Sequence, residues 1–444
     1  MTANTEWLDR SLSAVWHPCT QMKHHPTLPL VPVARAEGVW LEDFEGKRYL
    51  DGISSWWVNL FGHGNPRINA AITDQLSKLE HVMLAGFTHQ PAIELAERLS
   101  AKTDNALGHA FFASDGASAT EIALKMSFHA WQNYGQKQKQ EFVCLEGSYH
   151  GETVGALSVT DIALFRDAYA PLIRNEHVHL APSPDARLAQ AGENAEDVAN
   201  RAADALEKLF VAREGKIAAV IIEPLVQCAT GMAMHHPRYL QRARALCDHY
   251  QAHLICDEIA VGFGRTGTFF AHEQAGIRPD LLCLSKGITG GYLPLSVVLS
   301  SNIIYQAFWD DDVRRGFLHS HSYTGNPLAC RAALATLDIF DTENTLERNR
   351  QLSAVITAAL QPLATHPSIR NFRHTGMIWA MDVDTPLPDF SRRYFAAALA
   401  RGVLVRPIGN TIYLMPPYVL SPTDAQWVAD QMFAALNATL GASS

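Results

Sequence analysis

Short apolar runs alternate with amphipathic stretches through the middle of the chain. Runs of four or five apolar residues bounded by turn signals predict buried strands, expected at Phe142–Leu145, Ala218–Ile222, His253–Cys256, Leu281–Leu284 and Leu295–Leu299. Apolar residues at helical spacing predict helices at Pro91–Lys102, Ser118–Tyr134 and Pro237–Gln251. Strands that alternate with helices are typical of an α/β fold built on a mainly parallel sheet.

The pattern differs in two other parts of the chain. Residues 186–213 are rich in alanine and charge, which predicts one or two surface helices. After about residue 330 the pattern is helix-dominated, with amphipathic helices expected at Arg393–Ala400 and Thr423–Leu436. We therefore predict a large α/β domain over residues 61–334, with 1–60 and 335–444 as smaller peripheral units.

Composition narrows the function classes. Of the 444 residues 48% are apolar and only 18% charged, which suits a large globular protein, and the net charge of −9 argues against nucleic acid as the main partner. No apolar run is long enough to cross a bilayer, and the first twelve residues resemble no secretory signal, so no membrane partner is expected. Seven scattered cysteines without a CxxC pair predict reduced thiols and a cytoplasmic location. Cysteine and histidine show no clean zinc spacing, so no metal is expected.

Polar side chains follow three of the predicted strands. Glu223 and Asp257 come directly after their strands, and Lys286 follows the next strand by two positions. In open α/β sheets, ligands bind beyond the carboxyl ends of the strands. If these strands are parallel, one lysine and several carboxylates face the same crevice.

A lysine at the end of a buried strand can form a Schiff base. Burial lowers the pKa of an amine, and only the free amine attacks an aldehyde to form a Schiff base. Gly290 and Gly291, just past Lys286, leave space for a bulky ligand. For Lys286 alone, a solvent contact or a structural ion pair is the commoner role, and for Asp257 alone a cap or salt bridge is. Together they match the needs of a pyridoxal ring, whose nitrogen a buried carboxylate keeps protonated.

Three further features fit the same ligand. The segment Ser114–Ser118 precedes a predicted helix whose first backbone N–H groups favour a phosphate, although ordinary helix caps look the same. Tyr149 follows a predicted strand and is placed to lie over a flat ring. Trp56 is a candidate pocket wall or core residue, and Arg406 a candidate for bidentate carboxylate binding or for a surface ion pair.

The motif Gly262–Gly267 matches the dinucleotide-binding pattern GxGxxG. That pattern should open a helix directly after a strand, with an acidic residue about twenty positions later. Here it leads into Thr268-Phe269-Phe270, which indicates extended or irregular chain. We interpret this match as a false positive.

These pieces occur together in one known pattern. The run Asp257–Gly267, followed by Ser285-Lys286-Gly287, resembles the signature of class III aminotransferases, and the likeness extends from Trp16 to about Pro417. Further segments that carry it are Trp16-His17-Pro18, Asp51–Trp57, Tyr149-His150-Gly151, Gly325–Cys330 and Ile412–Tyr418. Within the class they most resemble biotin-pathway members, which aminate 8-amino-7-oxononanoate to 7,8-diaminononanoate with S-adenosylmethionine as amino donor.

The resemblance implies a fold type I pyridoxal-phosphate transferase with a smaller α+β domain built from both chain ends. It implies a homodimer with active sites at the subunit interface and pyridoxal 5'-phosphate as cofactor. On the matching positions, Lys286 would bind the cofactor covalently and Asp257 would pair with its ring nitrogen. Gly116 and Ala117 would bind its phosphate, and Tyr149 would stack on it and touch substrate.

The same resemblance assigns the remaining positions. Trp56 would line the oxononanoate pocket, Arg406 would hold the substrate carboxylate, and Ser320 would lie near substrate. His321 and Ser322 would reach the phosphate from the neighbouring subunit.

Three segments depart from the family pattern. Cys19 replaces a tyrosine that recognises the oxononanoate and stacks on the donor's adenine. Ala117 replaces a serine, and Ser320-His321-Ser322 replaces a Gly-Pro-Thr run. Two alternatives therefore stay open: a class III aminotransferase that uses lysine, a diamine or an ω-amino acid, and a non-catalytic binding protein on the same scaffold.

Overall fold

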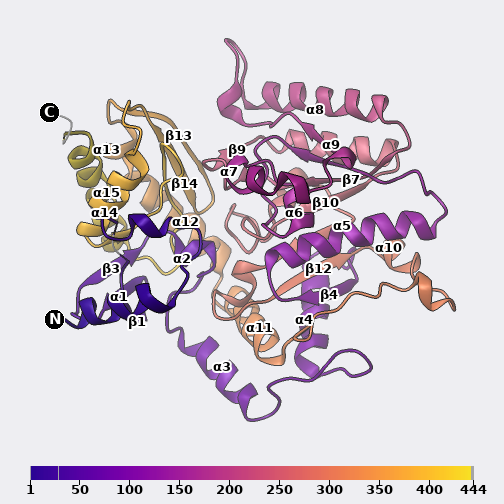
Figure 1. The fold of residues 1–444 in the computed structure, drawn as a ribbon, viewed down its shortest axis with the longest axis horizontal. Helices are drawn as coiled ribbons and strands as arrows, with labels where there is room; N and C mark the ends of the chain where they lie inside the picture. The colour runs from indigo at the N-terminus through magenta and orange to yellow at the C-terminus, as the bar shows by residue number, and fades with distance from the viewer. Residues whose placement is uncertain (1, 29, 442–444) are drawn as a thin grey trace. The chain divides into compact units, whose positions relative to one another are not determined.

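A computed structural model of the chain describes residues 2–28 and 30–441. The chain forms two compact units (Figure 1). The large unit comprises Arg67–Asn349, and the small unit combines the residues up to Pro66 with those from Arg350 onward. The small unit is thus built from both ends of the chain.

A seven-stranded sheet forms the centre of the large unit, in the order β4-β12-β11-β10-β7-β5-β6. Its strands are His109–Ala113 (β4), Glu141–Leu145 (β5), Val178–Ala181 (β6), Ile217–Ile222 (β7), His253–Asp257 (β10), Leu281–Leu284 (β11) and Ser296–Ser300 (β12). From β11 to β6 neighbouring strands are parallel, and only β12 runs antiparallel to its neighbours β11 and β4. The five strands expected from the sequence and the mainly parallel sheet are confirmed.

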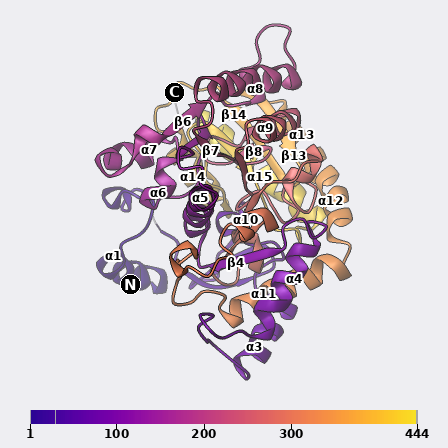
Figure 2. The same ribbon diagram turned by 90° about the vertical axis from the view of Figure 1, so that its right-hand side faces the viewer.

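The α-helices of the large unit are Pro66–Leu76 (α3), Gln90–Ala101 (α4), Gly116–Asn133 (α5), Val154–Ser158 (α6), Ala163–Arg166 (α7), Ala195–Ala212 (α8), Arg238–His249 (α9), Asn302–Gln306 (α10) and Pro327–Thr342 (α11). Of these, α4, α5, α8 and α9 contact strands of the sheet. Helix α5 contacts the central strands, and α8 and α9 pack together on the opposite side of them (Figures 1 and 2). All six residues of β7 are buried, because a strand covered on both faces has no solvent-facing side.

Two small sheets form the framework of the small unit. One has the order β1-β2-β3-β15 and the other β13-β14-β16. Their strands are Val33–Glu37 (β1), Trp40–Asp43 (β2), Arg48–Asp51 (β3), Ile369–Thr375 (β13), Ile378–Val383 (β14), Val403–Leu404 (β15) and Thr411–Leu414 (β16). The helices are Ala3–Ala14 (α1), Ser54–Trp57 (α2), Thr345–Ala359 (α12, which starts in the large unit), Gln361–Ala364 (α13), Phe390–Ala400 (α14) and Pro422–Gly441 (α15).

The expectation of a helix-dominated segment after residue 330 is wrong in part, because four strands lie there. Strand β14 is almost entirely buried and β16 wholly so, which leaves no alternation of apolar and polar positions to reveal them. Strand β15 has only two residues. The predicted helices at Arg393–Ala400 and Thr423–Leu436 are confirmed as parts of α14 and α15.

The remaining regular elements are short. A hairpin of Val226–Gln227 (β8) and Ala233–Met234 (β9) follows β7. The 3-10 helices are Met22–His24 (η1), Asp167–Leu172 (η2), Asn175–His177 (η3), Ala186–Leu188 (η4), Ala271–Ala275 (η5), Lys286–Thr289 (η6) and Val313–Arg315 (η7). The glycine motif at Gly262–Gly267 lies in turns and opens no α-helix, which supports its interpretation as a false positive. In the described part of the chain, no helix is both long and apolar enough to cross a bilayer.

Candidate active site

The register of three strands brings Glu223, Asp257 and Lys286 to one edge of the central sheet. Strands β10 and β11 are parallel with Asp257 opposite Cys283, and Lys286 lies three positions beyond that cysteine. On its other side β10 pairs in parallel with β7, which ends directly before Glu223. The common edge predicted from the sequence is therefore confirmed.

Lys286 begins η6 in an unusual backbone conformation. Its φ is +48°, in the left-handed region that non-glycine residues rarely adopt, and such strain is concentrated at functional sites. Burial lowers the pKa of its amine, against the opposing effect of Cys228, Asp257 and Glu223. Burial also raises the pKa of the Cys228 thiol, so this thiol is neutral. A lowered pKa favours the free amine, which is the form that attacks an aldehyde.

Asp257 is held by a buried histidine. Nδ1 of His150 lies 2.7 Å from one carboxylate oxygen of Asp257, and the amide of Ile259 donates to the other at 3.0 Å. His150 is 2% exposed, and its Nε2 has no hydrogen-bond partner among the described residues. Sequence reasoning assigned no role to His150, although it directly follows the singled-out Tyr149.

Glu223 connects the Tyr149 loop to the segment after β7. Its carboxyl group accepts hydrogen bonds from the amides of Tyr149 at 2.9 Å and Cys228 at 3.2 Å. Burial, together with the charge of Asp257, raises its pKa to about 7. The Tyr149 hydroxyl donates to Glu152 at 2.9 Å, and its ring contacts Phe165 edge to face. These contacts orient the backbone amide, the ring and the hydroxyl group of Tyr149.

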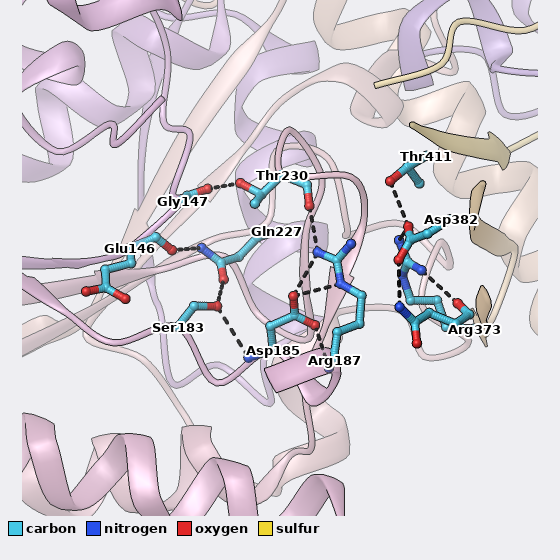
Figure 3. A network of polar contacts seen from close by, with 11 residues as sticks. Glu146, Gly147, Ser183, Asp185, Arg187, Gln227, Thr230, Arg373, Asp382 and Thr411 are labelled. Carbon is cyan, nitrogen blue, oxygen red and sulfur yellow. Dashed lines mark hydrogen bonds and ion pairs between the residues drawn. The ribbon is translucent and has the colours of Figure 1, made fainter. Parts of the chain in front are cut away.

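A polar network holds the β8–β9 hairpin against the loop that carries Tyr149 (Figure 3). The Gln227 amide donates to the Glu146 carbonyl at 2.9 Å and accepts from the Ser183 hydroxyl at 2.6 Å. In the same network Thr230 donates to the Gly147 carbonyl and Arg187 donates to the Thr230 carbonyl at 3.0 Å. The hairpin therefore holds the loop between β5 and α6 at two successive carbonyls.

The start of α5 forms a candidate anion site. The carboxylate of Asp115 caps the helix by accepting from the Ser118 amide at 2.9 Å, so the helix begins two residues earlier than predicted. The amides of Gly116 and Ala117 have no acceptor within the described parts of the chain. A Cβ on Gly151 would lie 2.6 Å from that of Ala117, so only glycine lets the Tyr149 loop approach this helix end.

Ser320, His321 and Ser322 lie in the large unit, in the loop between η7 and α11. Ser320 and Ser322 are exposed. Nε2 of His321 is 3.1 Å from Nε2 of His319, whose Nδ1 lies 2.8 Å from the Lys125 ammonium. Since Lys125 can only donate, His319 donates in turn to His321.

The small unit brings three predicted substrate residues together. The Arg406 guanidinium lies 4.5 Å from the ring centroid of Trp56, in a cation–π arrangement. Its Nη2 donates to the carbonyl of Cys19 at 2.8 Å. Cys19 is exposed, and Trp56 keeps 40% of its surface exposed. The clustering agrees with a shared role for Cys19, Trp56 and Arg406.

Trp56 belongs to a left-handed turn. Four successive residues, Ser54–Trp57, have φ values of +52°, +46°, +74° and +70°. None is glycine, and left-handed helical geometry costs L-residues about 1–2 kcal/mol each. Such a turn persists only where surrounding contacts hold it.

No group of three or more histidine, cysteine, aspartate or glutamate residues in the described chain is arranged to hold a metal ion. The seven cysteines, all within the described residues, form no disulfide bond, and all except Cys19 are buried.

Comparisons with known proteins agree with this geometry. The profile of the family Aminotransferase class-III matches residues 20–436. Adenosylmethionine-8-amino-7-oxononanoate aminotransferase of Helicobacter pylori is 46% identical over 417 residues, 92% of this chain and 93% of that protein. The enzyme of the same name from Synechococcus elongatus is 42% identical over 93% of this chain and 96% of its own length.

Solved structures lead to the same family. Adenosylmethionine-8-amino-7-oxononanoate aminotransferase from Methanocaldococcus jannaschii superimposes with a TM-score of 0.90 at 32% identity, covering 98% of this chain and 99% of its own. An omega transaminase from Pseudomonas jessenii in complex with PMP gives 0.93 at 26% identity, covering 98% and 99%. These neighbours confirm the fold type I architecture expected from the sequence. The chain belongs to the class III aminotransferases.

Proposed function

We propose that this protein is a pyridoxal-phosphate aminotransferase that converts 8-amino-7-oxononanoate to 7,8-diaminononanoate with S-adenosylmethionine as amino donor, in biotin biosynthesis. The observation that carries the chemistry is the placement of Lys286 and Asp257 at the ends of adjacent parallel strands. The substrates are supported by relatives of that name, which are 42–46% identical over nearly the whole chain.

The residues present fit the cofactor, which class III aminotransferases use. Gly116 and Ala117 offer two backbone amides to a phosphate at the start of an 18-residue helix. The charged carboxylate of Asp257 would pair with the ring nitrogen, and the lowered pKa of Lys286 suits covalent attachment to an aldehyde. Tyr149 would stack on the ring.

When bound, pyridoxal phosphate supplies an aldehyde that takes up amines and a ring that withdraws electrons. The amine of Lys286 would then act as the base that takes the proton from the Cα of the amino donor. Asp257 would keep the ring nitrogen protonated. The hydrogen bond from His150 fixes the orientation of that carboxylate.

The small unit and the 320–322 loop provide the proposed substrate contacts. Trp56 would line the acceptor pocket, and Arg406 would bind the acceptor carboxylate, with its orientation set by the contacts to Trp56 and Cys19. Ser320 would lie near substrate, as would Tyr149.

His321 and Ser322 are proposed to contact the phosphate of a second subunit, so the active protein would be a homodimer. The absence of disulfides among its seven cysteines, all of which the structure describes, supports the separate proposal of a cytoplasmic location. Exposed apolar side chains of the same segment support a partner there: Ile303, Trp309, Val313, Leu318 and Tyr323 are 65–77% exposed. Such a concentration of apolar surface is typical of a protein interface.

A second candidate is a class III aminotransferase with a different donor, such as lysine, a diamine or an ω-amino acid. It is favoured by Cys19, which offers no aromatic face to adenine, and by the close fold match to omega transaminases. The decisive assay supplies 8-amino-7-oxononanoate and compares S-adenosylmethionine with lysine as donor. If only S-adenosylmethionine supports turnover, the proposal stands. If only lysine supports turnover, lysine is the amino donor instead.

The catalytic assignment is tested with Lys286→Ala. We expect no measurable turnover, with the variant still folded by circular dichroism. Normal turnover in this variant would show that the assignment of Lys286 is wrong.

A further inference from the structure

The left-handed turn Ser54–Trp57 is held by one buried carboxylate. Asp51 has no exposed surface. One of its oxygens accepts from the amides of Ser55 at 2.8 Å and Ile53 at 3.3 Å. The other accepts from the Ser55 hydroxyl at 2.7 Å and from Nε2 of His63 at 3.1 Å. Ser55 directly precedes Trp56, so these bonds fix the backbone that aims the Trp56 ring.

His63 completes this arrangement in a defined tautomer. The Asn59 amide nitrogen lies 3.2 Å from Nδ1 of His63 and can only donate, so Nδ1 is the acceptor and Nε2 carries the hydrogen given to Asp51. The Asn59 backbone amide in turn donates to the Ser54 carbonyl at 3.0 Å. Asp51, His63 and Asn59 thus form one chain of hydrogen bonds that contacts the turn at Ser54 and Ser55.

The same carboxylate lies beside the strand that leads to Arg406. Asp51 is the last residue of β3 and pairs with Leu404 of the parallel strand β15, two positions before Arg406. The Gly52 amide donates to the Leu404 carbonyl at 3.0 Å, and a Cβ on Gly52 would lie 3.0 Å from that oxygen. The turn and the arginine segment are therefore in backbone contact, in addition to the contact between Arg406 and Trp56.

Other contacts hold neighbouring residues of the turn. The Ser54 hydroxyl donates to the Met415 carbonyl at 2.8 Å, and the Trp57 indole donates to the Tyr413 hydroxyl at 3.1 Å. These bonds fix Ser54 and Trp57 within the interior of the unit. The bonds of Asp51 act instead on Ser55, the residue adjacent to Trp56.

We infer that Asp51, oriented by His63, is a positioning residue for carboxylate recognition: it holds the strained turn so that Trp56 supports the guanidinium of Arg406. This rests on the proposed function, in which Arg406 binds the carboxylate of the acceptor. Asp51 touches neither substrate nor cofactor in this role. Its effect reaches the substrate only through Trp56 and Arg406.

The test is the steady-state kinetics of the holoenzyme carrying Asp51→Asn. The amide keeps the size of the carboxylate but places a donor against the donors of Ser55 and His63. We expect the KM for 8-amino-7-oxononanoate to rise roughly tenfold, in line with the loss of a charged hydrogen bond. The kcat and the half-reaction with the amino donor should stay within about twofold, since a remote binding contact affects KM more than the chemical step.

Two further variants separate positioning from general destabilisation. His63→Gln keeps a donor toward Asp51 and should retain a near-normal KM, whereas His63→Ala should raise it as Asp51→Asn does. Asp43→Asn is the matched control, because Asp43 is another buried carboxylate of the small unit that accepts from the Glu45 and Lys47 amides and the Tyr49 hydroxyl. It should lower thermal stability and leave KM unchanged.

An unchanged KM in folded Asp51→Asn overturns the inference, as does an equal rise of KM in Asp43→Asn. If Asp51→Asn does not fold, the KM values of the two His63 variants decide. A raised KM in His63→Ala with a near-normal KM in His63→Gln supports the inference, and an unchanged KM in His63→Ala overturns it. If the wild-type protein does not act on the oxononanoate, the proposed function fails separately. Acrylamide quenching of Trp56, defined by difference from Trp56→Phe, then tests the positioning, and unchanged quenching in Asp51→Asn overturns it.

Discussion

The carboxylate of Asp257 is fixed by His150, whose Nδ1 lies 2.7 Å from it in the interior of the large unit. Both side chains are at least 95% buried, so water does not compete for this hydrogen bond. A carboxylate held in this way is rigid before any ligand arrives, which is the condition for strong electrostatic stabilisation.

Replacing this carboxylate should affect the chemical step. We expect Asp257→Asn to lower kcat on the order of 100-fold or more, because a neutral amide does not keep the ring nitrogen protonated. His150→Asn should give a smaller loss, because the charge of Asp257 remains. Stopped-flow measurement of the donor half-reaction checks both. Equal activity of Asp257→Asn and wild type would contradict the role given to Asp257.

Glu223 makes stability depend on pH. Its pKa is raised to about 7, mainly by burial, from an ordinary value of 4.5. Between these values the folded protein retains a proton that the unfolded chain has lost, so stability falls as pH rises from about 4.5 to 7, by about 3 kcal/mol in total. In Glu223→Gln this contribution should be absent. Denaturant unfolding of cofactor-free protein at several pH values measures it, and an identical pH slope in both proteins would exclude this assignment.

Arg406 should act on binding rather than on turnover. Loss of a charged hydrogen bond costs about 1.5–3 kcal/mol, so Arg406→Ala should raise the KM for the oxononanoate roughly 10- to 100-fold with kcat little changed. Arg406→Lys keeps the charge but loses the planar guanidinium fork. Its KM for the oxononanoate should lie between those of wild type and Arg406→Ala. An unchanged KM in Arg406→Ala would remove Arg406 from the site.

Cys19 offers a gain-of-affinity test. The residue is exposed, and its carbonyl rather than its thiol contacts Arg406. Cys19→Tyr should therefore be tolerated and should add an aromatic face against adenine, worth about 0.5–1.5 kcal/mol. We expect a few-fold lower KM for S-adenosylmethionine. Weaker donor affinity in this variant would count against the placement of Cys19.

The dimer is tested at Leu318, which is 77% exposed. Leu318→Asp should shift the protein toward monomer and lower activity with it, since a charge is costly inside an apolar interface. Light scattering coupled to gel filtration measures the mass. The proposal fails if the wild-type protein is itself a monomer at assay concentration.

The large unit was largely predictable because its physics is local in sequence. Buried parallel strands produce short apolar runs, and the polar residues that follow these runs lie at one edge of the sheet, so the sequence predicts that Asp257 and Lys286 lie there together. For Glu223 the sequence predicts the position at this edge but not the contacts. Its contacts to the Tyr149 and Cys228 amides depend on loop conformations that no periodicity encodes.

The small unit was not predictable to the same degree. Some of its strands are very short, such as β15, or buried on both faces, such as β16. Strands β3 and β15 pair residues from opposite ends of the chain, such as Asp51 with Leu404. The left-handed turn is also hidden, because glycine is the usual sequence signal for positive φ and Ser54–Trp57 contains none. Only the three-dimensional contacts of Asp51 show why this turn forms.

The central claim is that Lys286 carries the cofactor, and chemical trapping tests it most directly. Borohydride reduction of the purified, cofactor-loaded protein fixes the cofactor on the lysine that holds it, and peptide mass spectrometry locates the modified residue. The account predicts a single pyridoxyl-modified peptide containing Lys286. A label on Lys139, the other lysine with a pKa lowered by burial, or no label at all, would contradict it.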